Sequence, residues 1–134
     1  MKVVLDASAM IAFLRDEPGA EFVTDHIRRS QHHVFAHALN LCEVYYDFSR
    51  ANGVDTAESA IDDLLALGIA ERSDMGPDFW RAMGRLKASH KRVSLADCAA
   101  LALANELGAA LFTADRHELE PLSTLSICQL VFIR

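Results

Sequence analysis

Two aspartates in this chain come at the ends of short apolar segments that have the composition of buried strands. Asp6 follows Val3 to Leu5, and Asp115 follows the segment from Ala110 to Thr113. The carboxyl ends of neighbouring parallel strands meet at one edge of an α/β sheet, which is where ligands bind in such folds. Asp97 lies near the start of the helix that leads into the second of these strands. The spacing therefore predicts that three carboxylates lie close together.

Carboxylates placed in this way require a cation or protons. Two like charges about 4 Å apart repel by roughly 4 kcal/mol at an effective dielectric constant of 20. Hard ions such as Mg²⁺ or Mn²⁺ prefer ligand sets made only of oxygen, and they retain water that can attack a phosphate. The residue types thus favour metal-dependent hydrolysis of a phosphate ester.

Each of these aspartates also has a purely structural interpretation. Asp6 or Ser8 could cap the helix that begins at Ala7, because both residue types accept hydrogen bonds from free N–H groups. Ser94 with Asp97 three positions later resembles a capping box, although Glu or Gln is the usual partner at that position. Asp115 could cap a short helix over residues 116–119.

Glu43 falls inside a helix expected from Ala38 to about Ala51, on the face that carries Asn40 and Tyr46. A glutamate in this position is either a solvated surface residue or a ligand aimed at a site, and the sequence alone leaves both open. Cys42 and Val44 beside it suggest that the helix is largely buried. Cys42, Cys98 and Cys128 have no C-x-x-C pairing and are expected to be small core residues.

Alternating apolar strands and amphipathic helices predict one α/β domain over residues 1–134, with a mostly parallel twisted sheet of about five strands flanked by helices. Pro18-Gly19 and Asn52-Gly53 mark breaks between helices. The expected strands span residues 3–5, 32–36, 69–72, 110–113 and 127–133, and the expected helices start at residue 7 and span 20–29, 38–51, 55–67, 77 to beyond 86, 94–108 and 116–119.

The overall composition is that of a soluble globular protein, with 51% hydrophobic and 24% charged residues in 134. No leader-like start and no apolar run long enough to span a bilayer is visible, so a cytoplasmic protein without a membrane partner is expected. A net charge of −6 argues against a general nucleic-acid coat protein. It does not exclude a nuclease, because an acidic metal site contributes negative charge itself.

Positive charge is concentrated in one segment from residue 81 to residue 92, which contains no acidic residue. One interpretation is a solvated helix face, which is what charge runs usually are. The other is a surface that contacts RNA phosphates, since the segment leads directly into the Asp97 motif. The candidate RNA contacts are Arg81, Arg85, Lys87, Lys91 and Arg92.

Four motifs in order carry a resemblance to a known family. They are the strand followed by Asp6-Ala7-Ser8, the segment Asn40 to Tyr46 around Glu43, Ser94-Leu95-Ala96-Asp97, and Leu111 to Arg116 around Asp115. Each motif alone is weak, but their order and spacing over essentially the whole chain resemble the PIN-domain family, specifically the single-domain VapC-type toxins of toxin-antitoxin pairs.

The resemblance implies a function as well as a fold. Asp6, Glu43, Asp97 and Asp115 would form an acidic metal and catalytic site, with Ser8 and Thr113 as supporting polar residues. The implied activity is that of an endoribonuclease dependent on Mg²⁺ or Mn²⁺. The implied partners are an RNA substrate, a cognate antitoxin protein and a second copy of the chain in a homodimer.

Other classes of protein remain as alternatives. A receiver domain or phosphoryl-transfer enzyme could also place an aspartate after its first strand, but it would be expected to present a lysine after a late strand, and this chain does not. A catalytically idle PIN-like binding module would be expected to lack an acid, and all four are present. A PIN nuclease that processes RNA without acting as a toxin stays open.

Overall fold

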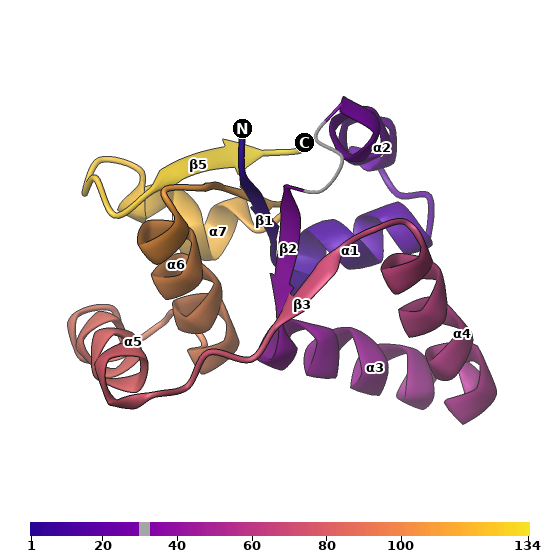
Figure 1. Cartoon of the computed structure of the whole chain (residues 1–134), viewed down its shortest axis with the longest axis horizontal. Helices are drawn as coiled ribbons and strands as arrows, with labels where there is room; N and C mark the ends of the chain where they lie inside the picture. Colours follow the sequence, from indigo (N-terminus) through magenta and orange to yellow (C-terminus); the bar gives the residue numbers. More distant parts are fainter. Residues whose placement is uncertain (30–32) are drawn as a thin grey trace.

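The computed structural model describes residues 1–29 and 33–134. In this range one sheet of five strands has the order β3-β2-β1-β4-β5, and every neighbouring pair is parallel (Figure 1). The strands are β1 (Val3–Leu5), β2 (Val34–His37), β3 (Ala70–Arg72), β4 (Ala110–Thr113) and β5 (Gln129–Phe132). The predicted α/β fold with a parallel sheet is confirmed.

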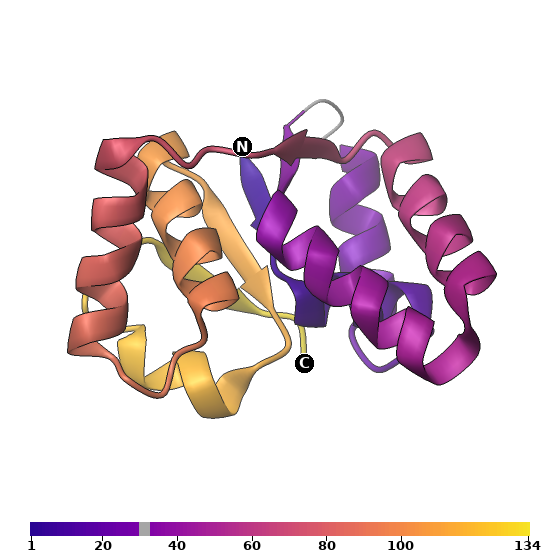
Figure 2. The ribbon, with the colours of Figure 1, turned by 90° about the horizontal axis from the view of Figure 1, so that it is seen from below.

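Helices cover both faces of this sheet. Helices α1 to α4 lie on one side of it and α5 and α6 on the other, as Figures 1 and 2 show from two directions. Their bounds are α1 (Ala7–Leu14), α2 (Ala20–Arg29), α3 (Ala38–Asn52), α4 (Val54–Ala66), α5 (Pro77–Ser89), α6 (Leu95–Leu107) and α7 (Arg116–Leu119), followed by the 3-10 helix η1 (Glu120–Leu122). None of the helices in the described ranges combines the length and apolarity needed to cross a membrane.

The central strand β1 supplies both hydrophobic cores because its side chains alternate between the two faces of the sheet. Val3 and Leu5 pack into the core under α1 to α4, whereas Val4 packs into the core under α5 and α6. All three side chains are buried. The apolar run at the start of the chain is therefore a strand buried on both faces, as its composition predicts.

The strand register brings the candidate site residues to one edge of the sheet. Leu5 pairs with Phe112, so Asp6 and Thr113 end two adjacent strands side by side. The Asp6 backbone N–H donates to the Phe112 carbonyl oxygen at 3.2 Å. The two strands with aspartates at their ends are thus nearest neighbours in the sheet.

Several predicted boundaries need correction. The second strand was expected over 32–36, but β2 extends to His37 because that residue keeps an extended backbone and pairs with Arg72. His32, where the strand was expected to begin, lies outside the described residues. The last strand is shorter than the expected 127–133, and it begins only at Gln129, after Ser126 takes a left-handed backbone conformation.

The prediction that all three cysteines are core residues is wrong for Cys42. Its side chain is exposed, whereas Cys98 is buried and Cys128 is half-buried. Helix α3 buries only one stripe, formed by residues such as Leu41, Val44 and Phe48. Cys42 lies next to that stripe on the helix surface and faces solvent.

His37 fixes the start of α3, the helix that carries Glu43. Its Nδ1 accepts a hydrogen bond from the Leu39 N–H at 3.1 Å, which makes His37 the N-cap. Its Nε2 lies 2.8 Å from the Asp74 carbonyl oxygen, and its ring stacks on Phe79. Since Nδ1 accepts, Nε2 must carry the proton that is donated to Asp74. One buried side chain thereby joins β2, α3 and α5.

Gly19, at the turn before α2, meets the end of the chain. Its φ is +99°, and a Cβ built there would lie 2.8 Å from both the carbonyl oxygen and Cγ1 of Ile133. Gly68 has a similar φ of +94°, but a Cβ at that position would have nothing within 4 Å. Gly19 is therefore needed both for its backbone conformation and for a close approach, and Gly68 only for its conformation.

We expect Gly19→Ala to destabilise the fold more than Gly68→Ala. The backbone strain common to both should cost about 1–2 kcal/mol of unfolding free energy. The clash with Ile133 should add about 1–3 kcal/mol at Gly19 alone. Chemical denaturation of the two variants measures the difference, and equal losses would show that the contact with Ile133 relaxes without cost.

Candidate active site

A pocket of about 270 Å³ lies at the edge of the sheet where β1 and β4 end. Four parts of the chain that are far apart in sequence meet there: the start of α1, the middle of α3, the connection from α5 into α6, and the segment after β4. The lining residues are Ser8, Glu43, Tyr46, Arg92, Ser94, Asp97, Asp115 and Glu118. Three of the four sequence-predicted acids line one pocket, and Asp6 is buried beside Ser8 at its inner end.

Asp6 is the most constrained of the acids, with a relative exposure of 1%. Its Oδ1 accepts hydrogen bonds from the Ala9 N–H at 2.9 Å and from the Ser8 hydroxyl at 2.7 Å, so it caps α1. Its Oδ2 is buried and has no hydrogen-bond partner in the described residues. Leaving such an oxygen unpaired is costly, which marks it as a position for a cation or a donor.

A chain of hydroxyl groups ties Asp6 to the end of β4. The Ser8 Oγ accepts a hydrogen bond from the Ala114 N–H at 2.8 Å and lies 3.2 Å from the Thr113 Oγ1. Because Ser8 gives its single proton to Asp6, the Thr113 hydroxyl is left to donate either to Ser8 or to the Asp6 carboxyl, whose pKa it lowers. Thr113 in turn accepts from the Asp115 N–H at 3.0 Å. Ser8 and Thr113 therefore lie where supporting polar residues are expected.

Asn40 of α3 links α1 and α6 beside the pocket. The sequence interpretation gave it no such role. This fully buried side chain accepts a hydrogen bond from the Ala7 N–H at 3.3 Å and donates to the Ala96 carbonyl oxygen at 3.2 Å. It thus connects the start of α1 with the start of α6. Glu43 lies three residues further along α3 and hence on the same side of that helix.

Asp115 is a helix cap, whereas Asp97 is not. Ser94 itself caps α6, because its Oγ accepts from the Asp97 N–H at 3.1 Å, and the Asp97 side chain lines the pocket. Asp115 does cap α7, with its Oδ1 accepting from the Glu118 N–H at 3.0 Å. Asp6 and Asp115 therefore act as caps and also lie at the candidate site.

The acids raise one another's proton affinity. Burial raises the pKa of Asp97 to about 7, and the charges of Asp6, Glu43 and Asp115 add to the effect. Burial also raises the pKa of Glu43, with further contributions from Asp6, Asp47 and Asp115. For Asp6, burial raises the pKa although the surrounding hydrogen-bond donors oppose it. The site thus carries more negative charge than its surroundings stabilise.

The donor set fits a hard divalent cation in its chemistry. All candidate ligands are carboxylate oxygens, and Asp6 contributes an oxygen without a partner. Within residues 1–29 and 33–134, however, no three of these side chains already converge on one cation position. A cation held by one or two of these carboxylates and by water is compatible with this arrangement.

Comparisons with known proteins identify the family of this fold. A family model described as PIN domain matches residues 3–120. The chain belongs to the PIN domain family. No curated protein matches the sequence at a significant level.

Solved structures share the fold of this PIN domain. The DNA-bound VapBC of Salmonella typhimurium has a TM-score of 0.79 at 14% identity, over 100% of this chain and 99% of that one. The sarcin-ricin loop cleaving toxin VapC20 of Mycobacterium tuberculosis has a TM-score of 0.72 at 15% identity, over 90% and 95%. VapBC-1 of nontypeable Haemophilus influenzae also reaches 0.72 at 15%, over 99% and 98%.

The PIN domain pocket is lined by a fourth acid that the sequence interpretation missed, which makes five acids together with Asp6. Glu118 lines the pocket, and its Oε2 is buried without a hydrogen-bond partner in the part of the chain that the structure describes. The available signal was its position three residues after Asp115, one turn along the same short helix. Arg92 also lines the pocket and supplies a positive charge among these acids.

The five basic residues predicted to contact RNA occupy different environments. Of the five, Arg92 is found among the described residues that line the acid pocket. Lys87 instead donates from Nζ to the carbonyl oxygens of Lys91 and Val93, both at 2.7 Å, so it holds the connection between α5 and α6. The guanidinium of Arg81 lies over the Trp80 ring at 4.7 Å. Contact with RNA stays a prediction for all five.

We expect the metal-free protein to lose stability as the pH rises from about 4 to about 7. Over this interval folded Asp97 keeps a proton that the unfolded chain has released, because its pKa rises from 3.8 to about 7 on folding. The unfolding free energy then falls with rising pH and levels off above about pH 7 for this group. Denaturation in a chelator across this range measures the slope.

Asp97→Asn should flatten this slope and make the metal-free protein more stable than the parent above pH 7, because it removes a charge from the cluster. Asp62→Asn is the matched control, since Asp62 is exposed on α4. If the unfolding free energy of Asp97→Asn falls with pH as steeply as that of the parent, Asp97 is not the source of the slope.

Proposed function

We propose that this PIN domain is a metal-dependent endoribonuclease of the VapC type that hydrolyses RNA phosphodiester bonds. The observation that carries the proposal is a pocket lined by Glu43, Asp97 and Asp115, with Asp6 buried against Ser8 of its lining and one oxygen of Asp6 unpartnered. Clustered acids that raise one another's pKa values are typical of a functional site.

Asp6, Glu43, Asp97 and Asp115 are the residues that would hold Mg²⁺ or Mn²⁺. When bound, the divalent ion supplies Lewis-acid stabilisation of phosphate charge and lowers the pKa of attacking water. The protein contributes the positioning: Ser8 and the Ala9 N–H fix one oxygen of Asp6 and leave the other free. Arg92 at the pocket wall contributes a charge that attracts the phosphate.

Asp97 can also hold a proton at neutral pH. Its pKa of about 7 places it near half-ionisation in the absence of a cation. A cation would favour the ionised form, so that metal binding should release a proton from this carboxyl.

We expect Mn²⁺ to bind the folded protein and raise its melting temperature, because a ligand that binds only the native state stabilises it. Asp6→Asn and Asp97→Asn should weaken binding by calorimetric titration and abolish most single-turnover cleavage of RNA. Asp62→Asn should behave like the parent in both measurements. Intact parent protein that shows no heat of binding at millimolar Mn²⁺ would contradict the metal site.

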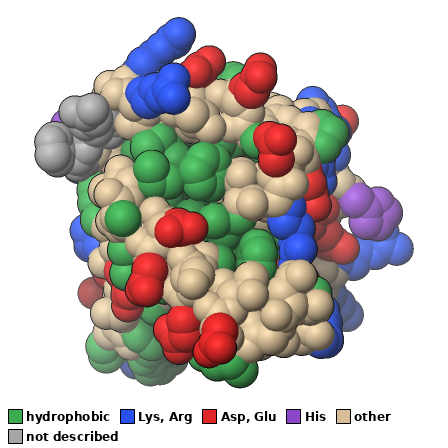
Figure 3. Space-filling model, turned by 90° about the vertical axis from the view of Figure 1, so that its right-hand side faces the viewer, with side chains coloured by type: hydrophobic (Ala, Val, Ile, Leu, Met, Phe, Trp, Pro, Cys, Tyr) green, Lys and Arg blue, Asp and Glu red, His purple; other side chains and the backbone are tan. Residues whose placement is uncertain are grey.

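The proposal extends to partners. The similar structures include VapBC complexes, which supports a cognate antitoxin protein as a partner of this chain. Figure 3 looks onto the side formed by α1 to α4, where hydrophobic side chains gather among acidic ones. Phe22 of α2 and Leu65 of α4 remain 36% and 40% exposed. Exposed apolar area is typical of protein-binding surfaces. A homodimer is also proposed.

We expect expression of the protein to arrest bacterial growth and the product of the adjacent gene to relieve the arrest. Asp6→Asn, confirmed as folded by circular dichroism, should not arrest growth, because cleavage would be lost. Cleavage in vitro by a parent protein that leaves growth unaffected would favour a role in RNA processing instead. Arrest by Asp6→Asn at the parental level would point to a binding module that needs no catalysis.

A further inference from the structure

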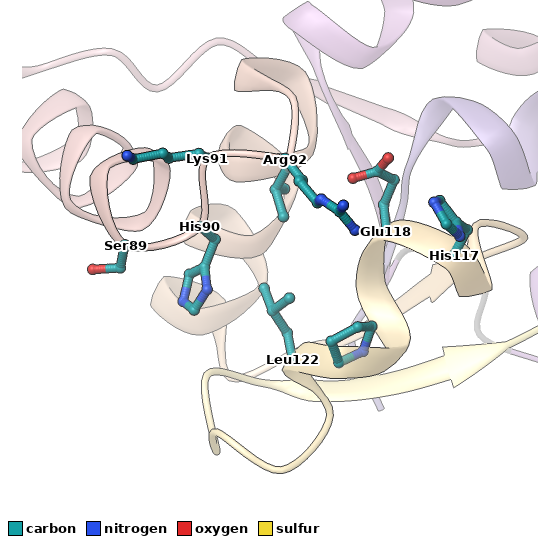
Figure 4. A pocket seen from close by; sticks show the side chains of 9 residues that line it. Ser89, His90, Lys91, Arg92, His117, Glu118 and Leu122 are labelled. Carbon is teal, nitrogen blue, oxygen red and sulfur yellow. The ribbon is translucent and has the colours of Figure 1, made fainter.

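A second pocket of about 350 Å³ adjoins the acid pocket. It lies between the connection from α5 to α6 and the segment formed by α7 and η1 (Figure 4). Arg92 and Glu118 line both pockets, so the two hollows share a wall. A chain molecule with one group in the acid pocket can therefore place the next group in this second pocket.

We propose that the second pocket binds the nucleotide adjacent to the scissile phosphate of single-stranded RNA. The proposal rests on the proposed nuclease function and assigns a substrate subsite to it. The size of the pocket agrees with one nucleoside, because about 350 Å³ is at the small end of ligand-binding cavities.

The floor of the pocket is suited to the flat face of a base. Val93 and Leu122 are buried members of the core under α5 and α6, and Pro121 lies beside Leu122. Apolar side chains can pack against a base that has left its stack. A nucleotide held in a duplex cannot present its base in this way.

The walls of the pocket supply hydrogen-bond donors and positive charge. His90 comes from one side and His117 from the other, with Arg92 between them, and the Lys91 side chain extends outward over α5 at the rim (Figure 4). Histidine rings can stack on bases, and lysine and arginine can pair with phosphate. Glu118 is the single carboxylate among the described lining residues. The lining therefore has the opposite charge character to the acid pocket.

Lys87 keeps this wall in place before any ligand binds. Its ammonium group donates to the carbonyl oxygens of Lys91 and Val93, and the Val93 N–H donates to the His90 carbonyl oxygen at 3.0 Å. These hydrogen bonds hold the backbone between α5 and α6 in one conformation. Little conformational entropy is therefore lost when a ligand fills the pocket. Lys87 is thus a positioning residue for the subsite.

A pair of matched double variants tests the subsite. Lys91→Gln with His117→Ala removes one ammonium and one imidazole from residues that line the pocket. Lys2→Gln with His33→Ala removes the same groups from exposed positions beside the amino ends of β1 and β2, at the opposite edge of the sheet from Asp6. Both double variants should remain folded, because none of the four side chains belongs to a core.

We expect the pocket variant to raise KM for a short single-stranded RNA at least about fivefold, the size of one lost stacking contact, with kcat nearly unchanged. The control variant should keep the parental KM. NMR titration of the parent with AMP, CMP, GMP and UMP should shift the amide signals of His90, Val93 and His117. These shifts should disappear in the pocket variant.

Each outcome distinguishes the subsite from the nuclease function. Equal KM values in both double variants, or nucleotide shifts confined to the acid pocket, would overturn the subsite while leaving the nuclease intact. If the parent cleaves no RNA but nucleotides still shift His90 and His117, the nuclease proposal fails and the pocket stands as a nucleotide site.

Discussion

The buried carboxyl of Asp6 is the constraint on which the rest of the site depends. It ends the central strand, caps α1 and receives the hydroxyl of Ser8, yet one of its oxygens has no partner. A sheet edge that buries such a group must compensate for it, but the surrounding elements bring four further acids and one arginine to the pocket beside it. The arrangement is costly without a counter-charge, which is why its chemistry points to a cation.

Structural and functional roles coincide at this site instead of excluding each other. Asp6 and Asp115 cap helices with one oxygen each, and a carboxylate has a second oxygen to offer. For Asp6, the hydrogen bond from the Ala9 N–H lowers the pKa and so opposes the effect of burial. Asp97 differs from these two residues. The Ser94 hydroxyl caps α6, and the Asp97 carboxylate lines the pocket.

The sequence predicts the order of elements and the parallel sheet because apolar runs and helical periodicity are local signals. It does not predict residues whose role arises only when distant segments meet. Asn40 resembles any polar helix residue until α1 and α6 are placed beside it. Lys87 belongs to a basic run, but its ammonium is held by the backbone of the following turn. Cys42 shows the converse limit, since a small apolar side chain does not specify which face of α3 is buried.

The charge of the protein can be understood from the same geometry. The net charge of −6 would repel RNA if it were spread evenly, but a cation at the proposed site would neutralise the pocket acids. Arg92 stands at the wall between the acid pocket and the adjoining pocket, which carries Lys91 and two histidines. A polyanion would thus meet positive charge beside a metal-filled site, with the acids of the outer surface further away. Local placement of charge, rather than its sum, decides which ligands such a surface attracts.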